Sequence, residues 1–596
     1  MPHRLKAGRR TEAPTRFLFF DTETLPRKVD DKTDELVFRL GAACFWERKR
    51  PGHPERTTWY DLRNKEALWV LLESLSETRQ GICLVAHNVG FDIRVLGGLK
   101  AIADMGWRIN DAIIDDPPFI LKARKGSSSL LILDWYNYFR GSLAFAGELL
   151  DVPKMPMPDF GASDAIWLAY CRNDVRVLLA AMQRYIAFLH EFDLGTFAHT
   201  LAGQSLNAFR HRFMEHDIFI HTRKDAIFLE RQGYYGGRVE MFRRNILPAQ
   251  TYTYVDINSA YPAVMRDGTY PVSFEGREEN LSVRRLSKLL QTYFLMARVV
   301  VRTETALFPL RMDGRLLFPI GEFETTLATP ELKIAIERGL VVSCSEAALY
   351  KGERIFTHFV DEMYELRKAA KQKPDAMWDE LLKRMMNSLF GKFGQHNYEW
   401  TELGIQNEYE DGIWRELDKD TGRVRTFRRI GGVLSERSSK DEGFNSFVAI
   451  AAHVTSASRT LLLRYIETAG WDHVYYCDTD SIITDEIGIA ALAPYLDASK
   501  LGLLKIEGTA KDVKLLAPKN YTFGEISKHK GRKVNAKRLP DGRYEQEQFV
   551  SLVGAMRIGW NGGPLIRRVT KRDRLTYKKG VLQDDDSISP FRLYRP

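Results

Sequence analysis

The sequence predicts a multidomain protein built from α/β and α+β domains. Its 596 residues exceed what a single hydrophobic core accommodates, so we expect three or more domains. Uninterrupted apolar runs, such as residues 17–20 and 81–86, predict strands that are buried on both faces. Segments with helical periodicity, such as residues 166–179, follow these runs. A hydrophobic content of 44% with 28% charged residues is typical of an ordinary globular protein.

The chain is basic, with a formal charge of +9 and a pI near 9.0. This favours a polyanion partner, although many basic proteins bind no nucleic acid. The five cysteines are scattered without a CxxC pair, which argues against zinc and disulfide frameworks and fits a reducing cytosol. No apolar run is long enough for a membrane span and the N-terminus shows no signal-peptide pattern, so we expect a cytoplasmic protein without a membrane partner. Residues 1–15 form a basic segment that we expect to be disordered.

Two carboxylates stand at the tip of a hairpin predicted over residues 474–483. Apolar residues lead into and out of the tip, which predicts two short strands joined by a tight turn. Asp478 and Asp480 are two positions apart and would share a face of an extended backbone. A divalent cation would remove the repulsion between them. Taken alone, however, this pattern is more often an Asx-rich turn.

Two further segments change that interpretation. Residues 256–262 (DINSAYP) follow a predicted strand, and residues 383–391 (KRMMNSLFG) lie between that segment and the hairpin. Together with residues 476–481 (YCDTDS), they resemble, in order, the first palm motif, the fingers motif and the second palm motif of the family B DNA polymerases. Two residues depart from these motifs, since Ala260 replaces leucine and Phe390 replaces the usual tyrosine.

The resemblance implies a right-hand polymerase with palm, fingers and thumb. Asp256 and Asp480, assisted by Asp478, would hold two Mg²⁺ ions, with Mn²⁺ as the alternative ion. The ring of Tyr261 would lie under the sugar of the incoming nucleotide and leave no room for a 2′-hydroxyl. The nucleotide-binding residues that the resemblance implies are Ser259, Tyr261, Lys383, Asn387, Arg367 and Lys371. A solvated basic face is the alternative for Arg367 and Lys371.

A second set of carboxylates precedes the palm motifs. Asp21 and Glu23 follow the first buried strand, Asp92 follows the second, and Tyr170 and Asp174 lie four positions apart on one face of a predicted helix. Each alone is more often a helix cap or a solvated charge. In order they resemble the motifs of the family's 3′–5′ exonuclease, a DnaQ-like domain with a ribonuclease H-like sheet.

In that domain four carboxylates hold two metal ions, which stabilise the attacking and leaving oxygens of phosphodiester hydrolysis. The resemblance implies that Asp21, Glu23, Asp92 and Asp174 are these ligands and that Tyr170 positions the attacking water. Retention of all four argues for an active nuclease.

Other segments resemble motifs that contact DNA in the family. They include a Y-x-G-G segment at residues 234–237, a T-x-x-(A/G)-R segment at 455–459 and a K-x-Y segment at 519–521. The alternatives are a glycine turn for the first and a surface lysine beside a buried tyrosine for the last. The DNA-binding residues that the resemblance implies are Asn88, Phe91, Ser142, Leu143, Tyr234, Gly236, Gly237, Gly391, Thr455, Arg459, Lys519 and Tyr521.

The resemblance divides the chain into consecutive units. Helical periodicity predicts a hairpin of two helices at the fingers, broken at residues 373–375, and residues 395–445 read as a β-rich excursion. The predicted boundaries are 1–15 for the N-terminal segment, 16–200 for the exonuclease domain, 201–262 for linker and palm, 263–355 for a first insertion, 356–394 for the fingers, 395–445 for a second insertion, 446–525 for the palm and 526–596 for a basic thumb.

The two insertions lie where the protein-primed subgroup of phages, adenoviruses and linear plasmids carries its terminal-protein regions. In that subgroup the first contacts the priming protein, and the second encircles template and aids processivity and strand displacement. Because the exonuclease motifs begin close to residue 1, we expect the additional N-terminal domain of cellular replicative relatives to be missing.

The sequence therefore predicts a template-directed, protein-primed DNA polymerase with 3′–5′ proofreading, encoded by a phage or mobile element. We expect a monomer in the bacterial host cytoplasm that acts on DNA template, primer and dNTPs and contacts a terminal protein. Two alternatives remain: a primer-independent or conventionally primed family B polymerase, and a 3′–5′ exonuclease whose polymerase half only binds DNA.

Overall fold

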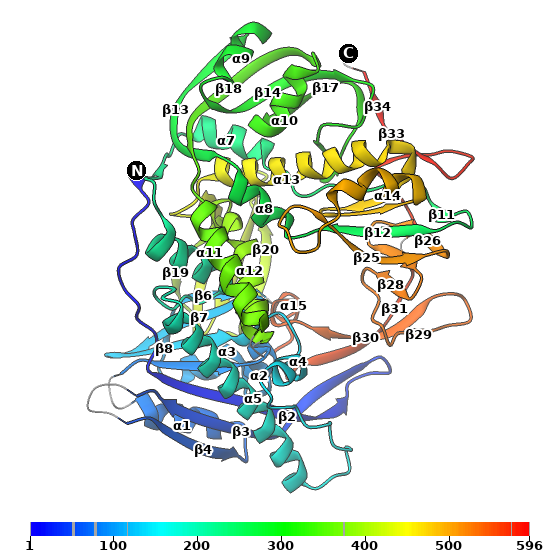
Figure 1. Cartoon of the computed structure of the whole chain (residues 1–596). Coiled ribbons are helices and arrows are strands. Elements are labelled where there is room, and N and C mark those ends of the chain that lie inside the picture. Colours follow the sequence, from blue (N-terminus) through cyan, green and yellow to red (C-terminus); the bar gives the residue numbers. More distant parts are fainter. Residues whose placement is uncertain are drawn as a thin grey trace.

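The computed structural model describes residues 2–49, 54–76, 80–115, 117–372, 376–573 and 575–594. In Figure 1 the first third of the chain lies at the bottom, a sheet from the middle of the sequence lies at the top, and a smaller sheet lies between them. Each of the three sheets is extended by segments that are distant in sequence. The interactions between distant segments build the two sites described below.

The lowest layer is a ten-stranded sheet, here called the large sheet. Its three central strands β2, β5 and β8 run parallel and the others antiparallel. The strand order is β29 (Lys537–Arg538), β30 (Tyr544–Val550), β31 (Leu565–Lys571), β3 (Thr33–Glu47), β2 (Arg16–Lys28), β5 (Ile82–Ala86), β8 (Ser128–Asp134), β7 (Phe119–Lys125) and β6 (Arg108–Ile114), with β4 (Arg56–Leu62) also paired to β3.

Strand β2 is buried on both faces, as its apolar run predicts. Phe17 and Phe19 pack into the cluster that contains the long helix α5 (Asp164–Glu191), whereas Leu18 and Phe20 pack into a cluster on the other face. That second cluster holds α1 (Ala67–Ser76), α2 (Val89–Val95) and α3 (Gly98–Asp104). We expected the strand to end at Asp21, but it continues to Lys28 because β3 pairs with it along its whole length.

The middle layer is a five-stranded antiparallel sheet, here called the central sheet. Its order is β10 (Val239–Met241), β23 (Val474–Asp478), β24 (Ser481–Thr484), β12 (Tyr252–Ile257) and β25 (Leu504–Ala510). Helix α13 (Val448–Ala469) packs against its strands and against α7 (Lys224–Gly233), α8 (Ala260–Asp267), α10 (Thr329–Glu337) and α14 (Glu486–Leu492). A separate sheet with the order β11 (Asn245–Ile246), β26 (Val513–Ala517), β27 (Asn520–Phe523) and β28 (Ile526–His529) lies beside it.

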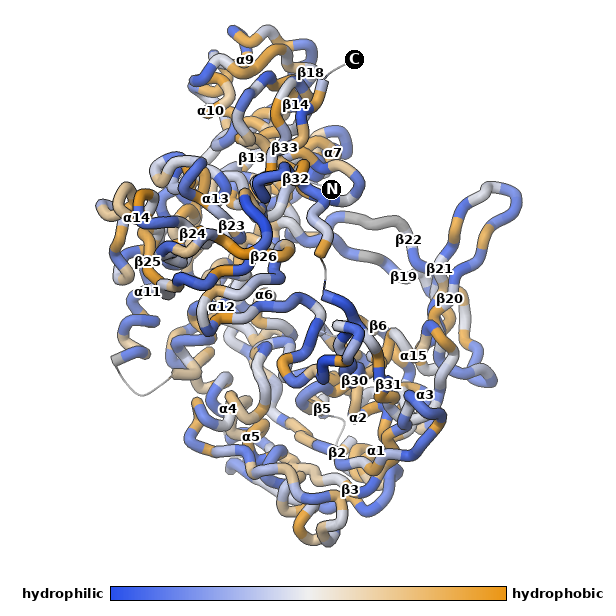
Figure 2. The backbone as a smooth tube through the Cα atoms, turned by 90° about the vertical axis from the view of Figure 1, so that its right-hand side faces the viewer, coloured by the Kyte–Doolittle hydropathy of each residue, from blue (hydrophilic) through white to orange (hydrophobic). Residues whose placement is uncertain are grey.

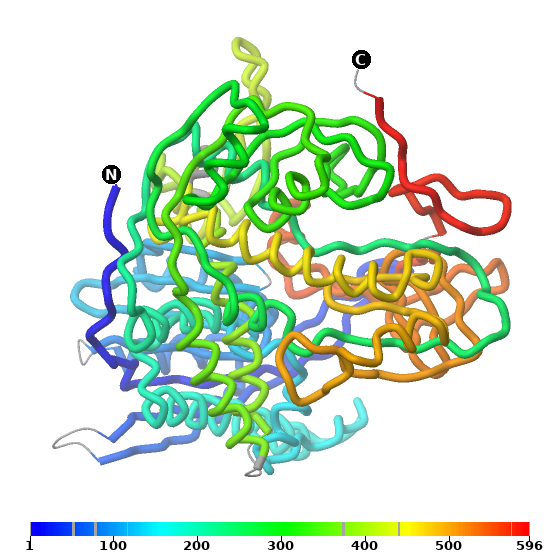
Figure 3. Tube along the Cα trace, turned by 45° about the horizontal axis from the view of Figure 1, so that its top comes forward, coloured from blue at the N-terminus to red at the C-terminus, as the bar shows by residue number. Residues whose placement is uncertain are grey.

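The upper sheet has the order β13 (Tyr270–Leu281), β18 (Val341–Glu353), β14 (Phe294–Thr303), β17 (Ile320–Ala328) and β34 (Arg592–Leu593). Its last strand comes from the end of the chain and pairs in parallel with β17, which can be followed in Figure 3. Helix α9 (Val283–Leu289) packs on β18, and the short pair β15 (Leu310–Met312) and β16 (Arg315–Leu317) precedes β17.

Helices α11 (Thr357–Gln372) and α12 (Ala376–Phe393) form the predicted hairpin, whose break at 373–375 lies outside the described residues. After α12 the chain forms a four-stranded antiparallel sheet, here called the projecting sheet, which confirms the β-rich excursion. Its order is β19 (His396–Ile405), β22 (Val433–Glu442), β21 (Val424–Ile430) and β20 (Gly412–Leu417). Figure 2 shows it extending to one side of the molecule.

Shorter elements complete the structure. Helix α4 (Leu143–Leu149) packs against both α5 and α12, and helix α6 (Leu201–Ala208) packs against α12. Helix α15 (Leu552–Arg557) lies against β20 and α2. The hairpin of β32 (Gly580–Leu582) and β33 (Ile588–Pro590) precedes β34. Among the described residues, no helix combines the length and apolar character that crossing a membrane requires.

The expectation that the N-terminal segment is disordered is wrong for residues 2–15. Strand β1 (His3–Arg4) pairs with β9 (Phe219–Ile220), and Leu5 is fully buried. The backbone N–H of Leu5 donates to the Ile218 carbonyl at 2.8 Å, and that of Gly8 to the Arg210 carbonyl at 2.8 Å. The basic composition predicted solvation, but these long-range backbone bonds and one buried leucine hold the segment against the fold.

Candidate active sites

The predicted hairpin of Asp478 and Asp480 forms from β23 and β24. The backbone between them is not extended as the spacing argument assumed, because Thr479 has a left-handed φ of 65°, but the Asp478 charge still acts on Asp480. The Asp480 N–H donates to the Asp478 carbonyl at 2.7 Å, which closes a tight turn. A β-branched residue in this conformation is strained, so surrounding contacts must hold the turn.

Asp256 is the penultimate residue of the neighbouring strand β12 and pairs with Ser481. The next residue, Ile257, donates its N–H to the Asp480 carbonyl at 2.7 Å, which ties the two segments together. Burial, together with the charges of Asp480 and Glu507, raises the pKa of Asp256 to about 7. Burial and the Asp478 charge raise the pKa of Asp480 to about 6. The structure therefore brings together the three predicted carboxylates, here called the central-sheet cluster.

The residues predicted to bind the nucleotide surround this cluster. Ser259, with a left-handed φ of 52°, precedes α8 and turns the chain there. Tyr261 on α8 stacks on Phe390 of α12 with ring centroids 4.7 Å apart. Lys383 on α12 is exposed, and its charge lowers the pKa of Asp256. The Asn387 side-chain amide donates to the Lys383 carbonyl at 2.8 Å, which places Asn387 one turn after Lys383 on the same face of α12.

The remaining nucleotide-binding candidates lie on α11. Arg367 is nearly buried and donates to Asp379 of α12 at 2.6 Å, so it joins the two helices. Lys371 is exposed near the end of the same helix. Gly391 has no atom within 4 Å of the position that a Cβ would occupy, which leaves its helix face open.

The two glycines of the Y-x-G-G segment have different surroundings. Gly236 faces open space, as expected for a residue that a phosphate approaches. A Cβ on Gly237 would lie 2.7 Å from Thr479, so this glycine packs against the carboxylate turn instead. Tyr234 packs against Gly394, and its carbonyl accepts a hydrogen bond from Arg311 at 2.9 Å.

Thr455 and Arg459 are predicted to contact DNA, but in this structure both side chains are buried, and Arg459 is held by contacts within the protein. The Arg459 guanidinium binds Glu331 at 2.8 Å and also donates to the carbonyls of Tyr235 and Gly236. Arg459 therefore supports the Y-x-G-G segment from beneath.

Lys519 and Tyr521 also have different roles. The Lys519 side chain is half exposed, and its amine lies 3.3 Å from Asp478. Tyr521 is buried against Tyr476 and Tyr254, so its side chain is not exposed for the predicted contact with DNA in this structure. The structure thus shows the alternative, a surface lysine beside a buried tyrosine. Tyr476 donates its hydroxyl toward Asp478 at 3.3 Å and accepts the Lys519 N–H at 3.0 Å.

The second predicted site lies on the large sheet. Asp21 and Glu23 are on β2, and Asp92 is on α2. The Asp92 carboxylate accepts the Thr22 hydroxyl at 2.6 Å and the Thr22 N–H at 3.1 Å, which fixes α2 against β2. Helix α5 places Asp174 and Tyr170 on its buried face. These elements assemble the large-sheet cluster of Asp21, Glu23, Asp92 and Asp174.

The large-sheet cluster contains a lysine that the motif analysis assigned no catalytic role. Lys154 forms an ion pair with Asp174 and lies 4.2 Å from the centre of the Tyr170 ring. Cys171 is a second addition, since its thiol lies 3.4 Å from the Asp21 carboxylate. One ligand atom each from Asp21, Glu23 and Cys171 lie within 4.8 Å of one another. Proximity to Tyr170 in the sequence was the one signal for Cys171.

Burial raises the pKa values of all four carboxylates, and repulsion from a neighbouring carboxylate adds to the shift for Asp21, Glu23 and Asp92. Burial, together with the Asp174 charge, raises the pKa of Asp21 to about 7, and burial with the charges of Asp21 and Asp174 raises that of Glu23 to about 9. The pKa values of Asp92 and Asp174 are raised by burial as well. One oxygen of Asp174 has no hydrogen-bond partner within the described ranges. Crowded carboxylates with an unsatisfied oxygen fit a divalent cation, for which oxygen is the preferred ligand.

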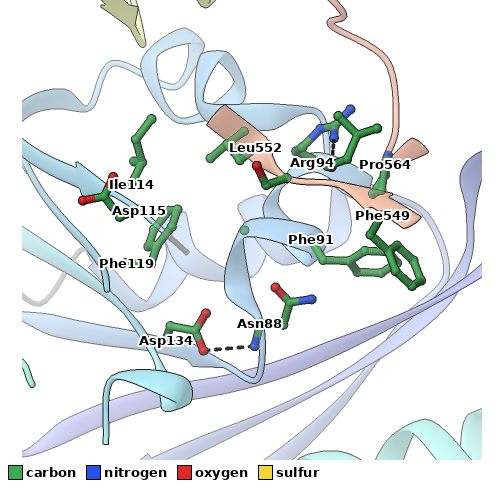
Figure 4. A pocket seen from close by; sticks show the side chains of 13 residues that line it. Asn88, Phe91, Arg94, Ile114, Asp115, Phe119, Asp134, Phe549, Leu552 and Pro564 are labelled. Carbon is green, nitrogen blue, oxygen red and sulfur yellow. Dashed lines mark hydrogen bonds between the residues drawn. The ribbon is translucent and has the colours of Figure 1, made fainter. Parts of the chain in front are cut away.

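The predicted DNA-contacting residues of the first third lie at the starts of two helices, α2, which carries Asp92, and α4, which packs against α5. Asn88, with a left-handed φ of 66°, precedes α2, and its backbone N–H donates to Asp134 at 3.0 Å. Ser142 is exposed and caps α4, whereas Leu143 is buried. A small pocket beside Asn88 is lined by Phe91 and by residues of the last seventy positions, including Phe549 and Leu552, as Figure 4 shows.

Comparison with known proteins agrees with this arrangement. The family model described as DNA polymerase type B, organellar and viral, matches residues 164–467, just over half of the chain. The chain belongs to this family of DNA polymerases. It is 29% identical over 452 residues to the DNA-directed DNA polymerase of Enterobacteria phage PRD1, a match that covers 69% of this polymerase and 74% of the relative.

Other relatives are fungal. A probable DNA polymerase of Neurospora intermedia is 26% identical over 391 residues, and one of Podospora anserina is 25% identical over 430 residues. These matches cover 62% and 65% of this polymerase but only 39% and 34% of the fungal proteins.

Among solved structures, Phi29 DNA polymerase in a ternary complex with primer-template DNA and incoming nucleotides superposes with a TM-score of 0.66 at 15% identity. That match covers 94% of this polymerase and all of the other chain, which shows a shared fold.

These findings confirm the resemblance to the family B DNA polymerases of the organellar and viral type. The multidomain fold with exonuclease-type and right-hand polymerase regions is confirmed as well. This polymerase is a DNA-directed enzyme, and enzymes of its family use divalent metal ions.

Proposed function

We propose that this polymerase extends a DNA primer at the central-sheet cluster and removes mispaired 3′ nucleotides at the large-sheet cluster. The observation that carries this proposal is the presence of two separate carboxylate clusters on different sheets. Each lies beside residues suited to a different phosphoryl-transfer reaction. The basic neighbours include Lys383 on the fingers helix and Lys519 in one case, and Lys154 in the other.

In the polymerase reaction, Asp256 and Asp480, with Asp478 assisting, would hold two Mg²⁺ ions, or Mn²⁺ in their place. Such ions stabilise the charge that develops on the attacking and leaving oxygens. Lys383 neutralises the triphosphate from the fingers side, and the effect of its charge on the pKa of Asp256 supports this assignment. Tyr261, held in place by Phe390, supports the sugar and excludes a 2′-hydroxyl.

In the exonuclease reaction, Asp21, Glu23, Asp92 and Asp174 would hold the metal ions. Tyr170 orients the attacking water, and Lys154 stabilises the negative charge of the phosphate. The position of Lys154 between Asp174 and the Tyr170 ring supports this assignment. Asn88, Phe91 and Ser142 would contact the frayed primer strand.

Template, primer and dNTPs are the proposed partners, and a monomer in the cytoplasm of a bacterial host is the proposed state. The predicted domain boundaries, with the upper sheet as first insertion and the projecting sheet as second insertion, belong to the same proposal. The upper sheet would contact a terminal protein that supplies the priming hydroxyl.

A feature of the projecting sheet supports strand displacement. A cavity of about 850 Å³ separates it from strand β6 of the large sheet. Its lining includes Arg415, Arg428 and Arg437 together with Trp400. Arginines and aromatic rings bind a single strand through its phosphates and bases. A template strand that passes here would be separated from its complement before it reaches the central sheet.

The test uses a 5′-labelled primer on a longer template with Mg²⁺, with and without dNTPs. Extension with dNTPs and shortening without them would support both activities. Shortening under both conditions would leave only an exonuclease whose polymerase half binds DNA. A template without a primer would test primer-independent synthesis. A template on which a nick separates the primer from an annealed downstream strand would test strand displacement.

A further inference from the structure

A buried ion pair lies directly behind the carboxylate turn. Arg238 is 1% exposed and donates from Nε to Glu240 at 2.6 Å. Its guanidinium lies over the ring of Phe318 at 4.2 Å and near that of Trp471 at 5.2 Å. These contacts hold Arg238 from the upper-sheet side and from the end of α13, so its backbone is fixed at one position.

That backbone holds the turn. The Thr479 N–H donates to the Arg238 carbonyl at 2.7 Å. Gly237 packs so closely on Thr479 that a Cβ there would lie 2.7 Å from its methyl group. Thr479 keeps its left-handed φ of 65° under these two restraints.

Strand β10 extends the same support to Asp478. Val239 pairs with Asp478 and Glu240 pairs with Cys477. On the other side, Lys579 donates its amine to the Val239 carbonyl at 2.9 Å. The ion pair between Arg238 and Glu240 therefore anchors β10, the strand that pairs with β23 up to Asp478.

The pair is a poor source of stability. Replacing a buried ion pair by well-packed apolar side chains is often neutral or stabilising. In addition, Nη1 of Arg238 has no hydrogen-bond partner in the described part of the chain. A role in fixing geometry accounts for the pair better than a contribution to folding energy.

We propose that Arg238 and Glu240 are positioning residues that hold Asp478 and Asp480 in the geometry that binds divalent cations. The inference rests on the proposed role of these aspartates as metal ligands. Neither positioning residue touches substrate, since both are buried and act through the backbone of Thr479 and Asp478.

The experiment compares Arg238→Met and Glu240→Gln, which break the pair, with the conservative Arg238→Lys. Glu346→Gln is the matched control, because Glu346 is also a buried glutamate paired with an arginine, Arg298, at 3.0 Å in the upper sheet. Primer extension is measured over a Mg²⁺ titration at saturating dNTP, and degradation of a single strand is measured on the same preparations.

We expect the half-saturating Mg²⁺ concentration for extension to rise at least about fivefold in Arg238→Met and Glu240→Gln. Arg238→Lys should recover part of this loss. Degradation should stay within about twofold of the unmodified enzyme, and Glu346→Gln should leave both activities unchanged. Shifts in Mg²⁺ dependence no larger than in Glu346→Gln would overturn the proposal, as would a parallel loss of extension and degradation, which would indicate a folding role.

Two further variants separate this proposal from the assignment of the ligands. Asp480→Asn should abolish extension, and if it does not, the ligand assignment fails rather than the positioning role. Thr479→Gly relieves the strained φ but loosens the turn, so it should fold and still require more Mg²⁺. An unchanged Mg²⁺ requirement in Thr479→Gly would contradict the idea that the turn must be held.

Discussion

The large-sheet cluster includes the positively charged side chain of Lys154, which is mostly buried. The central-sheet cluster instead lies at a hairpin, and its lysines are at the rim of the site. Lys154 is 22% exposed and pairs with Asp174, while Lys519 is 50% exposed and lies 3.3 Å from Asp478. The pKa of Glu23 rises to about 9, but that of Asp256 only to about 7. The two sites have the same ligand chemistry, but their negative charge is therefore offset differently. An internal lysine offsets it in the large-sheet cluster, and groups at the rim offset it in the central-sheet cluster.

The strongest test of this comparison removes the ligands of one cluster at a time. Asp480→Ala should lower extension about a thousandfold and leave degradation intact, because the lost ligand removes several kcal/mol of charge stabilisation. Asp21→Ala combined with Glu23→Ala should have the opposite effect. Both rates are measured on labelled primer-template and single-stranded DNA. Loss of both activities in a folded variant would show that the clusters are not independent.

The second test compares the two lysines. Lys154→Met should reduce degradation by about 10–100-fold, as expected when a buried partner of a ligating carboxylate is lost. Lys519→Met should reduce extension only a few-fold, because a half-exposed ion pair contributes little. Single-turnover rates of each reaction check this order. Equal losses would contradict the contrast between an enclosed and a rim lysine.

The third test uses pH without metal. The pKa values of Asp21 and Glu23 are raised from ordinary values of 3.8 and 4.5 to about 7 and about 9, so the folded protein retains protons that the unfolded chain has released. Their stabilising contribution is complete below about pH 4 and is lost as the pH rises toward 9. In EDTA we expect Tm to fall by a few degrees between pH 6 and 9.

The same pH series distinguishes the clusters. Asp256 and Asp480, with pKa values of about 7 and about 6, lose their contribution by about pH 7. Asp21→Asn combined with Glu23→Gln should therefore reduce the fall in Tm above pH 7, whereas Asp256→Asn should not. A decline above pH 7 that persists in the first variant would mean that other groups cause it.

The smallest expected effect concerns Phe390. Its buried ring stacks on Tyr261 at 4.7 Å, and Phe390→Tyr keeps that contact while adding one hydroxyl. We expect extension to change less than about threefold, since a volume-conserving change at a packed ring costs little, and degradation to stay the same. Steady-state incorporation of a single dNTP measures this, and a tenfold change would show that the hydroxyl matters at this site.

The motifs predicted which residues would form each cluster, because a spacing such as Asp21-x-Glu23 is local and the strand around it has a clear apolar pattern. They did not predict partners from distant elements. Lys154 and Cys171 join the large-sheet cluster only because α5 packs on β2. Glu507 reaches Asp256 because β25 pairs with β12.

Burial was the second property that sequence could not supply. Arg459 and Tyr521 occupy motif positions associated with DNA, yet both lie beneath the surface and support the residues above them. A motif records that a residue type occurs at a position, but exposure depends on what the rest of the chain places over it. The N-terminal segment shows the same point, since Leu5 is buried by residues near position 218.

The large sheet also sets the order in which the polymerase can be completed during synthesis. Strand β31 pairs with β3, and the Gly563 N–H donates to Glu35, 528 positions earlier in the chain. Until those residues leave the ribosome, β3 ends in an unpaired edge and buried Arg94 lacks its carbonyl partners at 550, 562 and 563. A fragment restricted to the first third would keep that edge open and would aggregate more readily than the full chain.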